Sequence, residues 1–344
     1  MKQVNPEKKP SRLRLLRIFN PLAKGIKRPS RLVRALLLLA LLYSLAAVPI
    51  CLYNYYRTLP DLFDPRPAPA GQAAEQPKPG VVFTGALITL GDQLLVAWLP
   101  NDIIYPTVLM DNPQNFQLGQ LEVIRDSVRV LRDKLSRQRT TDKIDPLVDR
   151  AFAEFNIKAD SWLFPSAEGS YRQAVGSLRA YQRNLVNGKS HFYPRSDNLI
   201  ELLDQLTSRL GGANQRLGNA PRDWTFRLSQ ETAGDRYSEG EKMTRVHVPW
   251  TEVDDHFYYA RGVAYALRAV MLAVDWEFRE VLKIKRSREL LQNIIAELAL
   301  ANFEPLLVQN GSRDSIWANH SLTLMATLES VRQKMLDLKQ ILER

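Results

Sequence analysis

The chain has little of the chemistry on which many enzymes and metal proteins depend. Among its 344 residues there is one cysteine, Cys51, and there are four histidines. A single cysteine excludes an intramolecular disulfide, so stability has to come from the burial of apolar side chains. Four histidines leave little scope for a metal site built from imidazoles. Serine-hydrolase, phosphate-loop and dinucleotide-binding glycine motifs are missing as well, so we expect no cofactor.

Negative charge is nearly absent from the first 34 residues. They hold eleven Lys and Arg against one acid, Glu7, whereas residues 35–344 hold 36 Lys and Arg and 36 Asp and Glu. The net charge of +10 therefore comes from the N-terminal segment alone. A nucleic-acid-binding protein would carry its basic patch on a folded module, so we expect no nucleic-acid partner. A basic segment before an apolar one instead predicts a cytoplasmic tail over residues 1–34, attracted to anionic lipids.

Long apolar runs are also scarce, and the chain has one, Ala35–Leu52. As a helix its 18 residues span roughly 27 Å, enough to cross the hydrocarbon core of a bilayer. Arg31 and Arg34 precede the run. Three tyrosines follow it, at a position typical of an interfacial aromatic belt: Tyr53, Tyr55 and Tyr56.

Two other interpretations of this apolar run compete with a membrane anchor: a cleaved signal peptide and a lipoprotein cysteine. A cleaved signal peptide has a shorter basic region and ends in a small-x-small site, but the candidate site Ser44-Leu45-Ala46 lies inside the run. A lipoprotein cysteine at Cys51 needs a small residue before it, and Ile50 stands there. We therefore predict an uncleaved anchor over residues 35–56, with the N-terminus in the cytoplasm and the C-terminal domain on the other side of the membrane.

Proline is concentrated after the anchor. The segment from Pro60 to Gly80 contains six prolines, which argues against regular helix or sheet and predicts an extended linker over residues 57–80. Such a linker lets the body stand away from the membrane. Within it, Leu62 and Phe63 are the residues most expected to pack on the body.

Apolar residues recur at steps of three and four throughout residues 81–344, which is typical of the buried faces of helices. Alternating patterns are nearly absent, so we expect an all-α fold: one transmembrane helix, a linker and a bundle of long helices with little or no sheet. The polar segment 218–248 is either a long loop or a boundary between two helical subdomains. The predicted helices cover 83–97, 115–138, 142–154, 167–187, 196–217, 250–282, 285–302 and 316–342. Their predicted N-caps are Thr84, Asp142, Ser166, Ser196 and Thr251.

The densest polar cluster follows Trp250. On a helix, Glu252, Asp255 and His256 lie on one face, at positions i, i+3 and i+4. Two carboxylates and an imidazole are suited to binding a metal ion or to general-base catalysis. No Glu-x-x-His or His-x-x-x-His pattern elsewhere supplies further ligands, and the helix dipole alone favours acids at a helix start. The plainer interpretation is therefore a helix start without a metal.

His320 is the second candidate for a catalytic role. It follows Ala318 and Asn319, where a loop leads into the last long helix. The plainer interpretation is again structural, because a histidine that hydrogen-bonds at the start of a helix is commoner than a catalytic one.

Four stretches of the body carry a resemblance when their order and spacing are taken together. They are Leu99-Pro100-Asn101-Asp102 with Met110-Asp111-Asn112, Ser196-Asp197-Asn198-Leu199, Pro249-Trp250 with Tyr258-Tyr259-Ala260-Arg261-Gly262, and Asn310-Gly311-Ser312 with Ala318-Asn319-His320-Ser321. They resemble a family of proteobacterial inner-membrane-anchored envelope proteins known only as a domain of unknown function (2333). The resemblance covers nearly the whole chain. It implies a helical periplasmic body on a membrane anchor and brings no catalytic residues.

Two functions from different classes are consistent with these features. The first is a non-enzymatic scaffold or adaptor that contacts membrane lipid through residues 35–56 and the basic tail and binds a protein or cell-wall partner in the envelope. The alternative is a periplasmic hydrolase or lyase that acts on an envelope substrate through Glu252, Asp255 and His256. The sequence leaves a homo-oligomer open.

Overall fold

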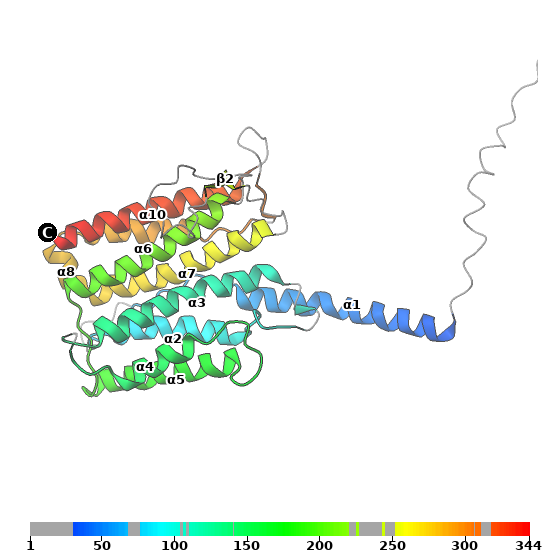
Figure 1. The fold of residues 1–344 in the computed structure, drawn as a ribbon, viewed down its shortest axis with the longest axis horizontal. Coiled ribbons are helices and arrows are strands. Elements are labelled where there is room, and N and C mark those ends of the chain that lie inside the picture. Colours follow the sequence, from blue (N-terminus) through cyan, green and yellow to red (C-terminus); the bar gives the residue numbers. More distant parts are fainter. Residues whose placement is uncertain are drawn as a thin grey trace, which may run out of the picture. The chain divides into compact units, whose positions relative to one another are not determined.

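Helices make up most of the described chain in this computed structural model (Figure 1). The all-α fold predicted from the sequence is confirmed. The chain divides into two units, Met1–Ile50 and Cys51–Arg344. The structure describes residues 30–67, 76–103, 106–107, 110–139, 141–219, 225–226, 243–244, 252–305, 307–310 and 318–344. Most of the predicted cytoplasmic tail therefore lies outside the described residues, as do Trp250 and Thr251.

Helix α1 (Arg31–Thr58) contains the whole predicted apolar run. Its leucine side chains are exposed from Leu36 to Leu45. Among the described residues it is the one helix long and apolar enough to cross a membrane, a test that an N-terminal signal sequence also passes. Apolar side chains exposed over this length require lipid or another apolar surface to cover them.

Helix α7 (Val253–Glu277) is the central element of the second unit. Its side chains are buried on every face from Phe257 to Val274, apart from Arg268, which is partly exposed. A helix that is apolar all round belongs in a core. It packs against five helices: α2 (Val81–Val96), α3 (Asp111–Val130), α6 (Ser196–Asn219), α9 (Arg288–Leu300) and α10 (His320–Glu343).

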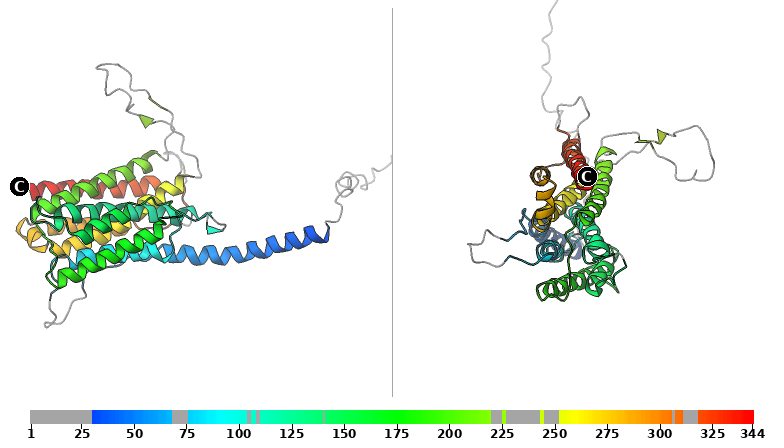
Figure 2. Two further views of the ribbon diagram at one scale, coloured as in Figure 1. Left: turned by 60° about the horizontal axis from the view of Figure 1, so that its bottom comes forward. Right: turned by 90° about the vertical axis from the view of Figure 1, so that its left-hand side faces the viewer.

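The remaining elements extend this core on both sides, as Figures 1 and 2 show. Helices α4 (Pro146–Phe155) and α5 (Ala167–Val186) pair with each other, and α5 covers α2. Helix α10 pairs with α6, and a π-helical turn, η3 (Leu131–Leu135), extends α3. Strands β1 (Thr225–Phe226) and β2 (Met243–Thr244) form a short antiparallel pair inside the predicted 218–248 loop, most of which lies outside the described residues.

The predicted helices agree with the observed ones, but some boundaries and caps were wrong. The helix expected over 250–282 breaks at Phe278, and the short helix α8 (Arg279–Ile284) follows it. The helix expected from 142 begins at Pro146, because Asp145 rather than Asp142 caps it by accepting from the Leu147 N–H. The predicted cap at Ser166 is confirmed, since its Oγ accepts from the Gly169 N–H at 3.1 Å.

The N-terminus of α2 is capped by Glu277 at the far end of α7, and the predicted cap at Thr84 was wrong. The Glu277 Oε1 atom accepts from the N–H groups of Val82 at 2.8 Å and Phe83 at 3.1 Å, and Oε2 accepts from Gly80 at 2.8 Å. Thr84 lies inside the first turn. The cap is 195 residues away in sequence from Val82, so a local pattern cannot reveal it.

Helices α3 and α7 approach each other so closely that their crossing requires glycine. A Cβ atom on Gly262 would lie 2.0 Å from the carbonyl oxygen of Phe116. A Cβ atom on Gly119 would lie 2.1 Å from the carbonyl oxygen of Tyr259. Backbone atoms cannot move aside without parting the helices, so these two glycines fix the distance and register of the pair.

The last turns of α1, which belong to the second unit, are held to the body by hydrogen bonds. The Tyr55 hydroxyl lies 3.2 Å from the Tyr258 hydroxyl and donates to the Glu304 carboxylate. The Arg57 guanidinium donates to the carbonyl oxygen of Val96 at 3.2 Å. The chain is thus fixed to α7 and to the end of α2 within one helical turn.

Part of the segment expected to be a free linker is also packed on the body. The Phe63 ring lies 6.1 Å from the Tyr265 ring, between centroids, whereas Leu62 is more exposed. Arg66 forms an ion pair with the buried carboxylate of Asp275 at 2.9 Å. Residues 60–67 are therefore bound along α7, and residues 68–75 of the expected linker lie outside the described residues.

We expect Gly262→Ala to lower the free energy of unfolding by about 3 kcal/mol, because the added methyl group meets backbone rather than a movable side chain. Gly176→Ala in α5 is the matched control. It too is a helical glycine, but nothing lies within 4 Å of the added Cβ. Alanine there should raise the free energy of unfolding by about 0.5–1 kcal/mol. Urea denaturation of the detergent-solubilised chain, followed by circular dichroism, measures both, and equal effects would contradict the close crossing.

Candidate functional site

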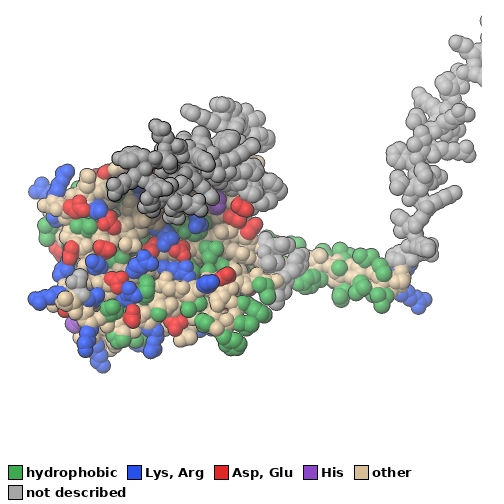
Figure 3. Space-filling model, in the orientation of Figure 1, with side chains coloured by type: hydrophobic (Ala, Val, Ile, Leu, Met, Phe, Trp, Pro, Cys, Tyr) green, Lys and Arg blue, Asp and Glu red, His purple; other side chains and the backbone are tan. Residues whose placement is uncertain are grey.

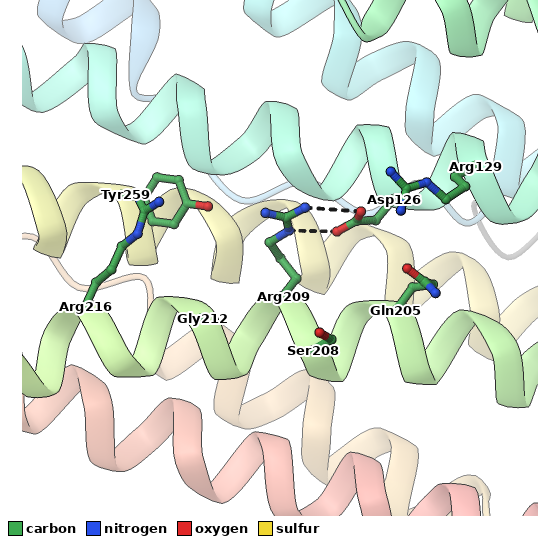
Figure 4. A pocket seen from close by; sticks show the side chains of 8 residues that line it. All are labelled: Asp126, Arg129, Gln205, Ser208, Arg209, Gly212, Arg216 and Tyr259. Atoms are coloured by element: carbon green, nitrogen blue, oxygen red, sulfur yellow. Dashed lines mark hydrogen bonds and ion pairs between the residues drawn. The ribbon is translucent and has the colours of Figure 1, made fainter. Parts of the chain in front are cut away.

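A groove of about 270 Å³ opens between α3 and α6, with Tyr259 of α7 at one end (Figure 4). Three arginines line it: Arg129 from α3, and Arg209 and Arg216 from α6. Asp126, Gln205, Ser208 and Gly212 complete the lining. The groove is therefore rich in hydrogen-bond donors and carries more positive than negative charge.

Helical periodicity explains why these side chains gather. Arg209 and Arg216 are seven residues apart, so they lie on the same face of α6 two turns from each other. The leucines of the adjacent face, among them Leu206 and Leu210, are buried in the core. Both helices are amphipathic, and their polar faces meet at the surface beside the α3–α7 crossing.

Arg209 and Asp126 form the fixed part of the groove. The Arg209 Nε and Nη2 atoms donate to the two Asp126 oxygens at 2.7 and 3.2 Å, and Nη1 lies 2.8 Å from a Glu122 oxygen. The Asp126 side chain is only 4 % exposed. Although burial lowers it, the hydrogen bonds and charge of Asp126 raise the pKa of Arg209 above its ordinary value. A pair this well satisfied is structural, because breaking it leaves a buried charge uncompensated.

Arg129 and Arg216 form the part of the groove that is available to bind a ligand. Both side chains are exposed, and among the described residues neither guanidinium is paired with a carboxylate. The Arg216 guanidinium lies 4.2 Å from the centre of the Tyr259 ring, a cation–π contact that orients it. Arg216 lies with Tyr259 at one end of the groove, and Arg129 lies near Gln205 at the other end (Figure 4). Exposed guanidinium groups of this kind are suited to a carboxylate or a phosphate.

The sequence analysis missed this groove. Arginines seven residues apart on a helix are usually a solvated face, and nothing local separates that case from a lined groove. The one usable signal is the spacing of Arg209, Gly212 and Arg216, which places a small residue between two arginines on one face.

The predicted acidic cluster is present at the start of α7 and is larger than expected. Glu252 stands exposed at the N-cap position, and Asn115 of α3 donates to the Asp255 carboxylate at 2.8 Å. Burial, followed by the charges of Asp111, Asp254 and Glu252, raises the pKa of Asp255 to about 6. Asp111 and Asn115 were not predicted, because they come from α3.

His256 has different neighbours from Asp255. It hydrogen-bonds to the backbone of Arg216, at the end of α6, and burial followed by the charge of Arg216 lowers its pKa. Its Nδ1 atom is buried without a hydrogen-bond partner in the described part of the chain. Within those residues no three His, Cys, Asp or Glu side chains are grouped to hold a metal ion. A shared catalytic or metal role for Glu252, Asp255 and His256 stays a prediction of the sequence.

His320 lies at the start of α10, as expected. Its Nδ1 atom accepts from the Gln309 N–H at 2.9 Å, so the proton of a neutral ring is on Nε2. The ring lies 6.4 Å from the Phe303 ring, and Asn319 caps the helix by accepting from the Leu322 N–H. These contacts fit the structural interpretation of His320.

We expect Asp255→Asn to raise the free energy of unfolding at pH 7 by about 1 kcal/mol. Because the pKa of Asp255 is raised to about 6, the folded chain holds this proton more tightly than the unfolded chain does. This tighter proton binding adds to the free energy of unfolding of the natural chain. The added stability is fully present below about pH 4 and is lost as the pH rises through 6. The full shift corresponds to about 3 kcal/mol, but the side chain is half exposed and solvent screens much of it.

Urea denaturation between pH 4 and pH 8 measures this effect. Asparagine keeps an acceptor for Asn115, so the hydrogen bond between α3 and α7 survives the substitution. The difference between the variant and the natural chain should disappear at pH 4, and a difference independent of pH would show that ionisation is not its cause.

A family model described as "Uncharacterized protein conserved in bacteria (DUF2333)" matches residues 30–344. This range includes α1 and all of the helical body. No curated protein and no solved structure matches the chain.

Proposed function

This chain belongs to the DUF2333 family of bacterial proteins, and we propose that it is a single-span inner-membrane protein whose helical body binds another envelope component as a scaffold or adaptor. The observation that carries the binding role is the groove in which Arg129 and Arg216 present guanidinium groups unpaired with described carboxylates. The envelope component would engage it through a carboxylate group, on an acidic protein segment or a cell-wall peptide.

The membrane part of the proposal rests on α1 and on the charges before it. The helix exposes apolar side chains along its length, and Arg31 and Arg34 stand at its first turn. Ten net positive charges precede residue 35, which by the positive-inside rule keeps the N-terminus in the cytoplasm. The electroneutral body then belongs in the periplasm.

Binding is favoured over catalysis by the chemistry of the groove. Its carboxylate, Asp126, is bonded to Arg209 through both oxygens, so it is not available as a general base. The other lining side chains supply N–H and O–H donors, and these hold an anion without acting on it. A volume of about 270 Å³ admits one or two acidic side chains rather than a large substrate.

A periplasmic hydrolase or lyase is the second candidate. One observation favours it: the pKa of Asp255 is raised to about 6, where a carboxyl group serves as a general acid near neutral pH. In that case His256, with its unpartnered Nδ1, would be the matching base. The two candidates make opposite predictions for substitutions at Asp255 and at the arginines.

A photocrosslinking amino acid at Ser208, in the groove, should capture an envelope component in living cells. The Arg129→Glu/Arg216→Glu double substitution should reduce that adduct at least fivefold, because it reverses the charge that attracts a carboxylate. Asp255→Asn should leave the adduct unchanged. The same crosslinker at Gln173, an exposed position on α5, is the matched control and should give no adduct. Adducts at Ser208 that persist undiminished in the double variant would exclude the groove as the binding site.

A reporter fused after Arg344 tests the topology separately. Alkaline phosphatase there should be active and a cytosol-dependent fluorescent protein dark, because the body is exported. The mature chain should keep its N-terminal residues, which mass spectrometry of the purified protein can detect. Loss of residues up to Ala46 would instead identify α1 as a cleaved signal peptide.

A further inference from the structure

The loop between α4 and α5 exposes three consecutive large apolar side chains. Trp162 is 54 % exposed, Leu163 is 58 % exposed and Phe164 is 95 % exposed. Single exposed apolar residues are common, but a contiguous group on a loop tip usually marks a surface that something covers.

This loop is joined to the segment that follows α2. The Trp98 indole N–H donates to the Ala159 carbonyl oxygen at 3.0 Å, and the Asn101 amide donates to the Ser161 carbonyl oxygen at 3.1 Å. The two hydrogen bonds hold the tip in place. Two more exposed apolar side chains lie nearby in the sequence: Val96, the last residue of α2, and Ile103 in the segment that follows. We call these five residues, Val96, Ile103, Trp162, Leu163 and Phe164, the apolar end patch.

The apolar end patch lies at the end of the second unit where the chain arrives from α1. Arg57 donates to the carbonyl oxygen of Val96, a residue of the patch. The Cys51 thiol approaches the carbonyl oxygen of Pro106, in the same connection between α2 and α3, at 3.9 Å. The exposed rings of Tyr53 and Tyr56 stand on this part of α1 as well. Cys51, at the end of the apolar run, and Arg57, just after it, therefore contact α2 and the connection that follows α2, without a free linker between the run and these contacts.

The opposite end of the body has a different surface. Helix α7 leads from Tyr258, beside Tyr55, to α8, a distance of about 30 Å at 1.5 Å per residue. A shallow depression there is lined mainly by charged side chains, among them Arg279, Lys283 and Arg288. Figure 3 shows green side chains gathered low on the right-hand end of the body and blue ones at its left-hand end.

We propose that the apolar end patch inserts into the headgroup boundary of the membrane that α1 crosses and so seats the body directly on the bilayer. Trp, Leu and Phe on a loop tip are favoured at this boundary, and the tyrosines of α1 belong to the same level. Lipid is the occupant that continuity favours, because Arg57, five residues after the apolar run, contacts Val96 of the patch. The inference rests on the proposed transmembrane anchor.

Spin-label accessibility in nanodiscs of phosphatidylethanolamine and phosphatidylglycerol tests the proposal on the full chain. In a Cys51→Ser background, single cysteines are introduced at Leu38, Phe164 and Ile284. A label at Phe164 should be at least threefold more accessible to oxygen, relative to a water-soluble nickel chelate, than a label at Ile284. Ile284 is the matched control, since it is an apolar residue, 77 % exposed, at the opposite end of the body.

The label at Leu38 separates the two ways in which the experiment can fail. If Leu38 behaves like Ile284, the anchor does not span the membrane and the proposed function is wrong. If the label at Leu38 is deep in lipid while the label at Phe164 behaves like that at Ile284, the transmembrane anchor is supported and the insertion of the patch is wrong. Shielding of Phe164 from both reagents would mean that a second copy or another protein covers the patch, which also overturns the proposal.

A label at Asp160 keeps the apolar side chains intact, because this exposed residue lies next to the patch. It should report lipid contact in the natural sequence and lose it in the Trp162→Glu/Phe164→Glu variant. Unchanged accessibility in that variant would contradict insertion even if the Phe164 label had supported it.

Discussion

The close approach of Gly262 to the backbone of Phe116, and of Gly119 to the backbone of Tyr259, is the constraint on which the rest of the body depends. It lets the backbones of α3 and α7 touch, and every further neighbour of α7 is positioned relative to that pair. The groove follows from it, because Asp126 lies two turns along α3 from Gly119 and Tyr259 lies one turn from Gly262. The Asn115–Asp255 hydrogen bond spans the same two helices. A wider crossing would separate all of these groups.

Both ends of α7 are used to hold other parts of the chain. At one end Tyr258 bonds to Tyr55, and at the other Glu277 supplies the cap of α2. Asp275 pairs with Arg66 and Arg288 beside that cap. One buried helix thus organises the N-terminal part of the body, and its acidic residues are confined to its ends. The groove, in contrast, is built at the edge of this core, where two polar helix faces meet and an anion can reach them.

Local patterns predicted the helices, because the apolar residues of each helix recur at steps of three and four within its own segment. They did not predict the cap of α2, since Glu277 is distant in sequence from Val82. Nor did they predict the raised pKa of Asp255, which comes first from burial and then from the charge of Asp111 on another helix. The groove was missed because an arginine on a helix looks the same whether it faces solvent or a neighbouring helix. Proline content predicted the absence of helix in residues 60–67, but it does not tell an extended segment that is bound from one that is free. Chemistry that depends on several helices becomes visible only when their arrangement is known.

The attachment of Tyr55 to Tyr258 and Glu304 determines where a mechanical force on the chain enters the body. A pull delivered through the chain at residue 55 reaches the most deeply buried helix first, and the peripheral pair α4 and α5 carries none of it directly. A force applied at this residue is thus resisted by the best-packed part of the protein.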